Sequence, residues 1–265
     1  MSTMKILATS DTHGLLDGLD KAIDKNEPDV VVFAGDIAPA TIGVSPIDYV
    51  RNTFFPFVER HPSSEFILVP GNHDIWAQTY DGEFPSELKD ILPHNFTFLV
   101  DAGVEIKGQL FWGTPWVPFI CGHWAYESHD ELDESDIAKR FELIPSDTDV
   151  LITHTPPRIK DCELDISLQN KRGPFGSISL GRMYAECKIH PKLHFCGHIH
   201  SGDHAPFDVV NVKKGTFSID HFSCELRHTS TTSVCNVSRV DERYQIAYDP
   251  TVVEISDDGS VKFLA

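Results

Sequence analysis

The chain has 265 residues, of which 41% are hydrophobic and 23% charged; this excludes a largely disordered protein and fits one large α/β domain or two small ones. The formal charge of −18 disfavours a nucleic-acid backbone as the main partner, because phosphates would be repelled over most of the surface. No apolar run approaches the ~20 residues that a membrane-spanning helix needs, so we expect no membrane association.

The first half of the chain alternates apolar strands with amphipathic helices. We expect strands over 4–11, 29–36 and 65–74, and helices over 15–26, 46–61 and 85–92. Pro56 should kink or break the second of these helices, because proline has no N–H to donate and its ring displaces the preceding turn. Residues 96–117 predict a pair of strands with a turn near Lys107-Gly108.

The second half begins in the same way and then becomes β-rich. We expect helices over 131–144 and 181–190, strands over 149–157 and 192–200, and later strands over 213–222, 232–240, 252–255 and 261–265. No repeat or linker marks a boundary, so the sequence predicts a single domain over 1–265 with a β-rich C-terminal part from about 205. This order favours a layered α/β sandwich over an open nucleotide-binding sheet.

The beginning of the chain, MSTMKILATSDTHG, has no basic start, apolar middle or small-residue cleavage site of a signal peptide. The six cysteines are scattered without a C-x-x-C pair. Both features favour a cytoplasmic protein whose thiols are reduced.

The apolar strands of the α/β part all end in Asp, Asn or His. The five segments are Asp11-Thr12-His13, Gly35-Asp36, Gly71-Asn72-His73-Asp74, Thr153-His154 and Gly197-His198-Ile199-His200. Because ligand sites gather outside the carboxyl ends of strands in layered α/β folds, we expect these side chains to converge. Residues two apart in a strand face the same side, so Asp-x-His and His-x-His can each bind one metal ion or two adjacent ones.

Each segment alone has a simpler interpretation. Asp11-x-His13 and Gly35-Asp36 could be turns, residues 71–74 a loop, and His154 a structural histidine. The repetition of the same residue types at five strand ends favours a common metal centre.

These blocks, SDTHG, AGDI, PGNHD, ITHTPP and CGHIH, resemble in type and order the signature of the calcineurin-like metallophosphoesterases. GTPWVPFICGHWAY, THTPP and the tail NVSRVDERYQIAYDPTVVEI are similar to segments of the small brain-type metallophosphoesterase-domain subgroup. The chain departs from the pattern at Pro39, where an acid is usual, and over 201–230, which is longer than expected. The resemblance implies a four-layer αββα sandwich of two mixed sheets flanked by helices.

The resemblance also implies two divalent metal ions, with Mn²⁺ favoured and Fe, Zn²⁺ or Co²⁺ suited to the same mixed nitrogen and oxygen ligands. One ion would be held by Asp11, His13, Asp36 and His200, and the other by Asp36, Asn72, His154 and His198. A hydroxide bridging the two ions would attack phosphorus. His73 would be the general acid, and Asp74 would either orient the His73 ring or cap the helix that follows.

Three further residues are weaker candidates for substrate binding. Trp112 and Trp116 could form an apolar wall for a nucleobase or aryl group, or could be ordinary core aromatics. Arg158 could contact phosphate, or could be a solvated loop charge.

We therefore expect a phosphatase or phosphodiesterase that acts on small phosphate mono- or diesters, with 5′-mononucleotides or cyclic nucleotides favoured. The alternative is a catalytically silent scaffold that binds nucleotides or proteins. Lost ligands would mark such a scaffold, and none of the expected ligands is missing. The sequence leaves the native metal, the physiological substrate and the oligomeric state open.

Overall fold

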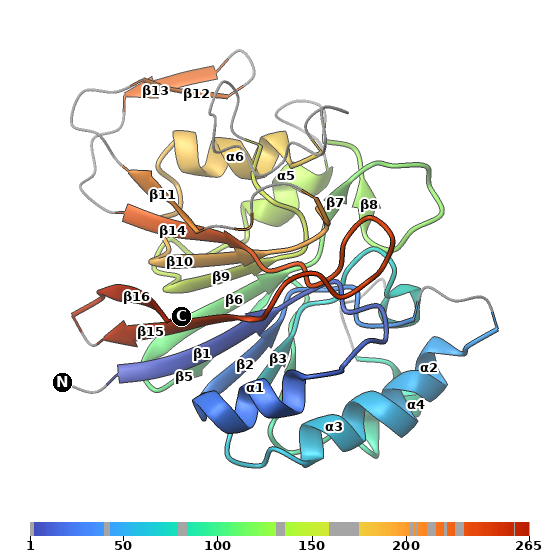
Figure 1. The fold of residues 1–265 in the computed structure, drawn as a ribbon. Helices are drawn as coiled ribbons and strands as arrows, with labels where there is room; N and C mark the ends of the chain where they lie inside the picture. Colours follow the sequence, from blue (N-terminus) through green and yellow to red (C-terminus); the bar gives the residue numbers. More distant parts are fainter. Residues whose placement is uncertain are drawn as a thin grey trace.

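Two six-stranded sheets lie face to face, and helices cover their outer faces (Figure 1). The computed structural model describes residues 3–39, 43–78, 84–130, 136–158, 175–201, 204, 206–210, 216–219, 222–225, 231–256 and 258–264. In this part of the chain, no helix combines the length and apolarity that crossing a membrane would require.

The first sheet joins the beginning of the chain to its end, in the order β16-β15-β1-β2-β3-β4. Its strands are β1 (Thr3–Thr9), β2 (Val30–Phe33), β3 (Glu65–Leu68), β4 (Phe96–Phe98), β15 (Thr251–Ser256) and β16 (Val261–Leu264). Strands β1 to β4 are parallel, whereas β15 is antiparallel to β1. The carboxyl ends of β1, β2 and β3 therefore share one edge.

The second sheet has the order β11-β14-β10-β9-β6-β5. Its strands are β5 (Ala102–Ile106), β6 (Gln109–Thr114), β9 (Val150–Thr153), β10 (Leu193–Cys196), β11 (Phe207–Val210) and β14 (Thr231–Asn236). The four inner strands are parallel and both outer strands are antiparallel to their neighbours. Two small sheets pair β7 (Val117–Pro118) with β8 (Glu127–Ser128), and β12 (Thr216–Ile219) with β13 (Phe222–Glu225).

The strands are apolar on both faces because each sheet is covered on both sides. In β2, Val30 and Val32 point into the core between the sheets, while Val31 and Phe33 pack against helices. The outer layers contain α1 (Leu19–Asn26), α2 (Pro46–Tyr49), α3 (Phe55–Glu59) and α4 (Ser86–Lys89) on one side, and α5 (Asp136–Phe141) and α6 (Ile178–Ala185) on the other. This confirms the expected four-layer αββα sandwich.

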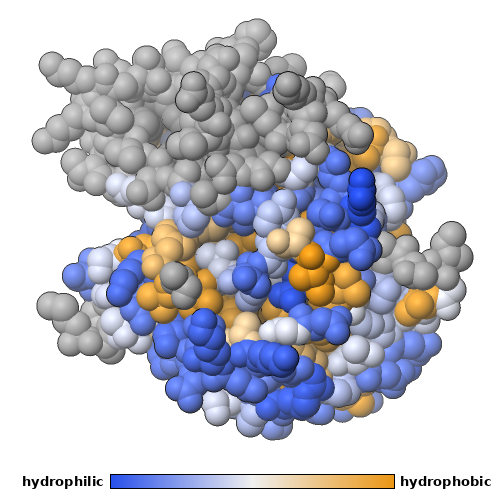
Figure 2. Space-filling view, viewed as in Figure 1, coloured by the Kyte–Doolittle hydropathy of each residue, from blue (hydrophilic) through white to orange (hydrophobic). Residues whose placement is uncertain are grey.

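Figure 2 shows hydrophilic side chains over the helices at the bottom of the view and apolar patches nearer its middle.

Several helix boundaries differ from the sequence prediction. Helix α1 begins at Leu19 rather than at residue 15, because Gly18 adopts a left-handed φ of 81°. Helix α6 begins at Ile178 rather than at residue 181, where the Ser177 side chain accepts a hydrogen bond from the backbone of Leu180. Residues 131–135 of the expected acidic helix lie outside the described residues.

Pro56 changes the helix over 46–59 without ending it. Residues Val50–Phe54 form a π-helical segment (η1), in which the N–H of Phe55 bonds to the carbonyl of Val50. Residue 56 has no N–H for the carbonyl four residues earlier, and the wider turn accommodates this loss.

The segment over 96–117 contains three strands, and they belong to different sheets. Strand β4 extends the first sheet, whereas β5 and β6 form a hairpin at the edge of the second. The predicted turn at Lys107-Gly108 is confirmed: both residues have positive φ, 49° and 75°, as a tight two-residue hairpin turn requires.

The described cysteines Cys121, Cys187, Cys196 and Cys235 are not in disulfide bonds, and the last two are buried. Cys162 and the side chain of Cys224 lie outside the described residues. The expectation of one domain over 1–265 stays a prediction.

A buried histidine on β10 links the second sheet to α6. The ring of His194 lies 2.8 Å from the Tyr184 hydroxyl through Nδ1 and 2.8 Å from Thr153 Oγ1 through Nε2. The Thr153 hydroxyl donates to the carbonyl of Thr155, so Nε2–H must donate to Thr153 and Nδ1 accepts from Tyr184. Burial lowers the pKa of His194 to about 3.

This histidine should make the fold less stable in acid. Below pH 6.5 the unfolded chain takes up a proton at His194 that the folded chain refuses down to about pH 3, so stability falls across that window. Between pH 7 and pH 5 we expect a loss of about 2 kcal/mol in the free energy of unfolding. His194→Gln keeps a donor towards Thr153 without a titratable ring, and should reduce the loss by that amount in urea titrations with EDTA. The control variant His94→Gln, at an exposed histidine, should lose as much stability between pH 7 and pH 5 as the wild type. Equal pH dependence in His194→Gln and wild type would contradict this assignment.

Candidate metal centre

The five predicted segments meet at one edge, where the carboxyl ends of both sheets lie together. The backbone N–H of Asp11 donates to the carbonyl of Gly35 at 2.9 Å, which joins the loops after β1 and β2. The N–H of Gly197 donates to the carbonyl of His154 at 2.9 Å, which joins the loops after β10 and β9. The N–H of His198 reaches the Asp11 carboxylate at 3.0 Å and so connects the two sheets.

Four of the gathered residues have a left-handed backbone conformation. The φ angles of Asp11, His13, Asp36 and His198 are 50°, 44°, 54° and 69°. Non-glycine residues seldom adopt this region, although Asp and His do so more often than most, and such strain persists only where the surroundings hold it. The expectation that Asp-x-His and His-x-His lie within strands, with both side chains on one face, is wrong. Strand β1 ends at Thr9 and β10 at Cys196, so these pairs lie in loops.

A first group of donors is formed by Asp11, His13 and His200, whose ligand atoms lie within 4.8 Å of one another. Nε2 of His200 is 3.2 Å from Asp11 Oδ1 and 3.4 Å from Nε2 of His13. Asp36 Oδ2 lies 3.9 Å from His13 Nε2. Two imidazole nitrogens that face each other between carboxylates are an arrangement that a cation would satisfy on all sides.

A second group surrounds His154. Its Nε2 lies 3.3 Å from Asp36 Oδ2 and 3.0 Å from Asn72 Oδ1, and the same Asn72 oxygen is 2.9 Å from Nδ1 of His198. Asp11, Asp36 and His154 also have ligand atoms within 4.8 Å of one another. The two carboxylates thus lie between the two groups.

The electrostatics of the second group favour a positive charge beside Asp36. Burial opposes the ionisation of this carboxyl, but His154, with smaller contributions from His73 and His13, holds the pKa of Asp36 well below its usual value. Burial alone would lower the pKa of His154, but Asp36 raises it to about 9. His154 Nδ1 bonds to the carbonyl of Ala34 at 2.8 Å, which directs Nε2 towards Asp36. A divalent ion would replace the proton that Nε2 otherwise carries.

Two glycines, Gly71 and Gly197, let the backbone pack closely against the donor side chains. A Cβ at Gly71 would overlap the Asp36 side chain, and a Cβ at Gly197 would overlap the side chains of Ser10 and Asp11. Carboxylate oxygens, an amide oxygen and imidazole nitrogens together suit divalent transition-metal ions. The residues present therefore fit a pair of such ions.

His73 lies beside the ligand groups and is half-buried. Its backbone N–H donates to Asp36 Oδ1 at 2.7 Å, and its ring centroid is 4.9 Å from that of His13. On another side the ring of Trp124 lies 4.1 Å away. The ring of His73 is thus held next to the centre, where it can reach a bound ligand.

Asp74 does not have the contacts that the sequence suggested. It precedes the short 3₁₀ helix η2 (Ile75–Ala77) but makes no side-chain capping bond, and its carboxylate has no contact with the His73 ring among the interactions of the described residues. Instead it accepts hydrogen bonds at 2.9 to 3.3 Å from the N–H groups of Gly71, Ile37 and Ala38 and from the indole of Trp76. Asp74 therefore ties the loop of Asp36 to the loop of Asn72.

Trp112 and Trp116 do not form a wall of the centre. Both pack against the cluster beneath α5 and α6. The indole of Trp116 donates to Asp101 at 2.8 Å, and the Arg140 guanidinium lies 4.6 Å above its ring. The alternative of ordinary core aromatics is the one that fits. Arg158 lines a cavity that His198 also lines.

Tyr244 lies at the centre although the sequence did not predict it there. Its ring centroid lies 4.7 Å from that of His13 and 5.3 Å from that of His200. It belongs to the loop between β14 and β15, which passes over the carboxyl ends of the strands in Figure 1. Asp241 Oδ1 holds this loop by accepting from the N–H groups of Arg243 and Gln245 at 2.8 and 3.0 Å. No local motif marks the tyrosine. Half of the longer segment over 201–230 lies outside the described residues.

Comparisons with known proteins bear on the family and the fold. The family model described as calcineurin-like phosphoesterase matches residues 4–202. Human metallophosphoesterase domain-containing protein 1 is 26% identical over 220 residues, which cover 75% of this chain and 61% of that protein. A UPF0046 protein of Caenorhabditis elegans is 28% identical over 209 residues, which cover 74% of this chain and 63% of that protein. The chain thus spans less than two thirds of the length of these relatives.

Among solved structures, the protein TT1561 of Thermus thermophilus is similar with a TM-score of 0.54 and 16% identity. The alignment covers 99% of this chain and 98% of that one. At this identity the likeness concerns the fold alone.

Proposed function

The chain belongs to the calcineurin-like phosphoesterase family, and on that premise we propose that it hydrolyses small phosphate mono- or diesters, with 5′-mononucleotides or cyclic nucleotides favoured. The observation that carries the proposal is the convergence of seven donor side chains from five loops, with a further histidine beside them.

In this proposal each group of donors holds one divalent ion, with Mn²⁺ favoured. The ligands are Asp11, His13, Asp36 and His200 for the first ion, and Asp36, Asn72, His154 and His198 for the second. Such a pair of ions, when bound, lowers the pKa of water and neutralises charge on a phosphate. The contacts of Asp36 with His13 and His154 support its role as the shared ligand.

The residues of the chain then orient the ester and move a proton. His73 donates a proton to the leaving oxygen, since its ring lies beside the donors without being one of them. Asp74 holds the loops of Asp36 and Asn72 together by accepting hydrogen bonds from their backbone N–H groups.

Turnover by the purified protein tests this function. We expect hydrolysis of p-nitrophenyl phosphate or bis-p-nitrophenyl phosphate, and of one member of a panel of mono- and cyclic nucleotides, that depends on added Mn²⁺. EDTA should abolish it and fresh Mn²⁺ should restore it. Turnover of the monoester or of the diester separates phosphatase from phosphodiesterase. No metal-dependent turnover on any of these substrates would favour the silent binding scaffold instead.

A further inference from the structure

A cavity of about 500 Å³ opens beside the candidate metal centre. Its lining includes Phe119, Ile120, His129, Arg158, Phe175 and His198. His198 belongs to both places, because its Nδ1 lies 2.9 Å from Asn72 Oδ1 in the second donor group. A molecule whose phosphate reaches the donors would therefore have its remaining part at the mouth of this cavity.

Three large apolar side chains of the cavity are exposed to water. Phe119, Ile120 and Phe175 are 49%, 47% and 39% exposed, and they are among the most exposed large hydrophobic residues of the described chain. The rings of Phe119 and His129 are stacked, with centroids 4.8 Å apart and planes inclined by 17°. Apolar groups gathered around a concave site are typical of a ligand-binding surface, and a parallel stack can be extended by a further flat ring.

The charges of the cavity suit a phosphate ester. Arg158 brings a guanidinium, which matches phosphate oxygens, and its backbone N–H is fixed by the carbonyl of Ser177 at 2.8 Å. Among the described lining residues the acidic group is Asp130, whose carboxylate accepts from the N–H groups of Ile178 and Ser179 at 2.6 and 3.1 Å. The negative charge of Asp130 is thus engaged at the start of α6.

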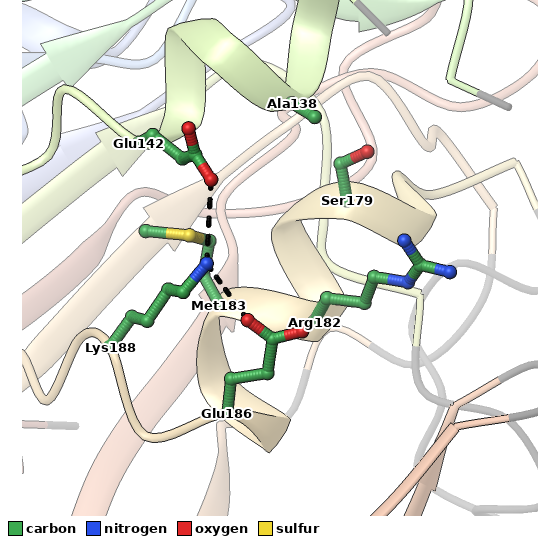
Figure 3. Close-up of a pocket in the computed structure, with 7 residues that line it drawn as sticks. All are labelled: Ala138, Glu142, Ser179, Arg182, Met183, Glu186 and Lys188. Atoms are coloured by element: carbon green, nitrogen blue, oxygen red, sulfur yellow. Dashed lines mark hydrogen bonds and ion pairs between the residues drawn. The ribbon is translucent and has the colours of Figure 1, made fainter. Parts of the chain in front are cut away.

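The hollow between α5 and α6 provides a contrast (Figure 3). There Lys188 lies 3.4 Å from Glu142 and 2.8 Å from Glu186. Among the residues whose side chains the structure describes, its lining includes no aromatic residue and no proposed metal ligand. Of these two cavities, only the first joins aromatic surface to the donor groups.

We propose that the cavity beside His198 receives the planar aromatic part of the substrate, a nucleobase or an aryl group, while Arg158 contacts the phosphate held at the metal centre. This inference rests on the proposed function. It assigns to the cavity the role of aromatic surface that the sequence suggested for Trp112 and Trp116. The volume accommodates a group the size of a nucleoside. Phe119 and Phe175 are then specificity-determining residues.

A pair of ligands that differ only in the base tests the cavity. Adenosine 5′-monophosphate and ribose 5-phosphate are compared on the Mn²⁺-loaded protein, by kcat/KM where they are hydrolysed and by Kd where they are not. The wild type should prefer the nucleotide by about tenfold, the usual contribution of one stacked base. In Phe119→Ala and in Phe175→Ala the preference should fall severalfold, and Phe119→Trp should retain it. Leu143→Ala, at an exposed apolar residue outside the lining, should leave it unchanged.

The outcomes separate this proposal from the function on which it rests. The proposed role of the cavity is overturned if the wild type does not prefer the nucleotide over ribose 5-phosphate. It is also overturned if the wild type and both alanine variants show the same preference, even when turnover is observed. Metal-dependent turnover that fails on every substrate overturns the proposed function. In that case, a Kd preference that the alanine variants lose still supports the cavity as a base-binding site.

Discussion

Replacing Asp36 with asparagine is expected to remove both metal ions and to lower phosphoesterase turnover by a factor on the order of 10³ or more. Asp36 is only 1% exposed, and its Oδ2 lies 3.3 Å from His154 Nε2 and 3.9 Å from His13 Nε2. Asparagine has nearly the same volume but no charge, and its NH₂ group would point a donor at a cation. Since both donor groups include Asp36, one substitution should affect both ions.

Elemental analysis of the purified protein provides the direct measurement. We expect the metal content of Asp36→Asn to fall far below that of the wild type, while thermal unfolding in EDTA shows that the variant is still folded. Asp136→Asn removes the same charge from an exposed site whose only described ion pair is with Lys139, and it should keep its metal. An unchanged metal content in Asp36→Asn would disprove the shared ligand.

Replacing His73 with alanine should leave the metals in place but lower turnover by about 10²- to 10⁴-fold, the usual contribution of a general acid. The backbone N–H of His73, which bonds to Asp36, is retained in this variant, so the ligand groups should keep their geometry. Only the ring beside His13 and Trp124 is lost.

The dependence on the leaving group separates proton donation from a purely structural role. An alkoxide needs a proton to depart far more than p-nitrophenolate does, so the defect of His73→Ala should be larger with an alkyl phosphate than with p-nitrophenyl phosphate. His123→Ala, at an exposed histidine, serves as the control and should behave as the wild type. Full turnover by His73→Ala on an alkyl phosphate would remove the assigned role.

The residue types at the strand ends were enough to predict a common site, because the apolar pattern of the strands indicates that they are buried between layers. A strand such as Val30–Phe33, apolar on both faces, can only lie between two layers. Parallel strands of this kind bring their carboxyl ends to one edge, and the polar residues that follow them meet there. The order of the five blocks along the chain then indicated the family.

Contacts inside the loops could not be predicted, because they depend on backbone conformations that local sequence does not specify. Asp74 is adjacent to His73, but hydrogen bonds from two distant loop residues, Ile37 and Ala38, turn its carboxylate away. Trp116 follows a strand of the second sheet, but its side chain packs against Arg140 of α5. In both cases a neighbour in sequence was less important than a neighbour in space.

By itself, the amino-acid order determined a layered α/β sandwich and which residue types stand at the strand ends, since the apolar pattern is a property of the chain alone. The four layers and the family followed from the resemblance of the five blocks to a known signature. Only the tertiary structure decided that four of those residues take a left-handed φ, that Tyr244 lies against His13 from more than 200 residues away, and that Phe119, His129 and Phe175 line a cavity next to His198. The physical reason is that these features arise from hydrogen bonds and packing between segments that the chain brings together only when it folds.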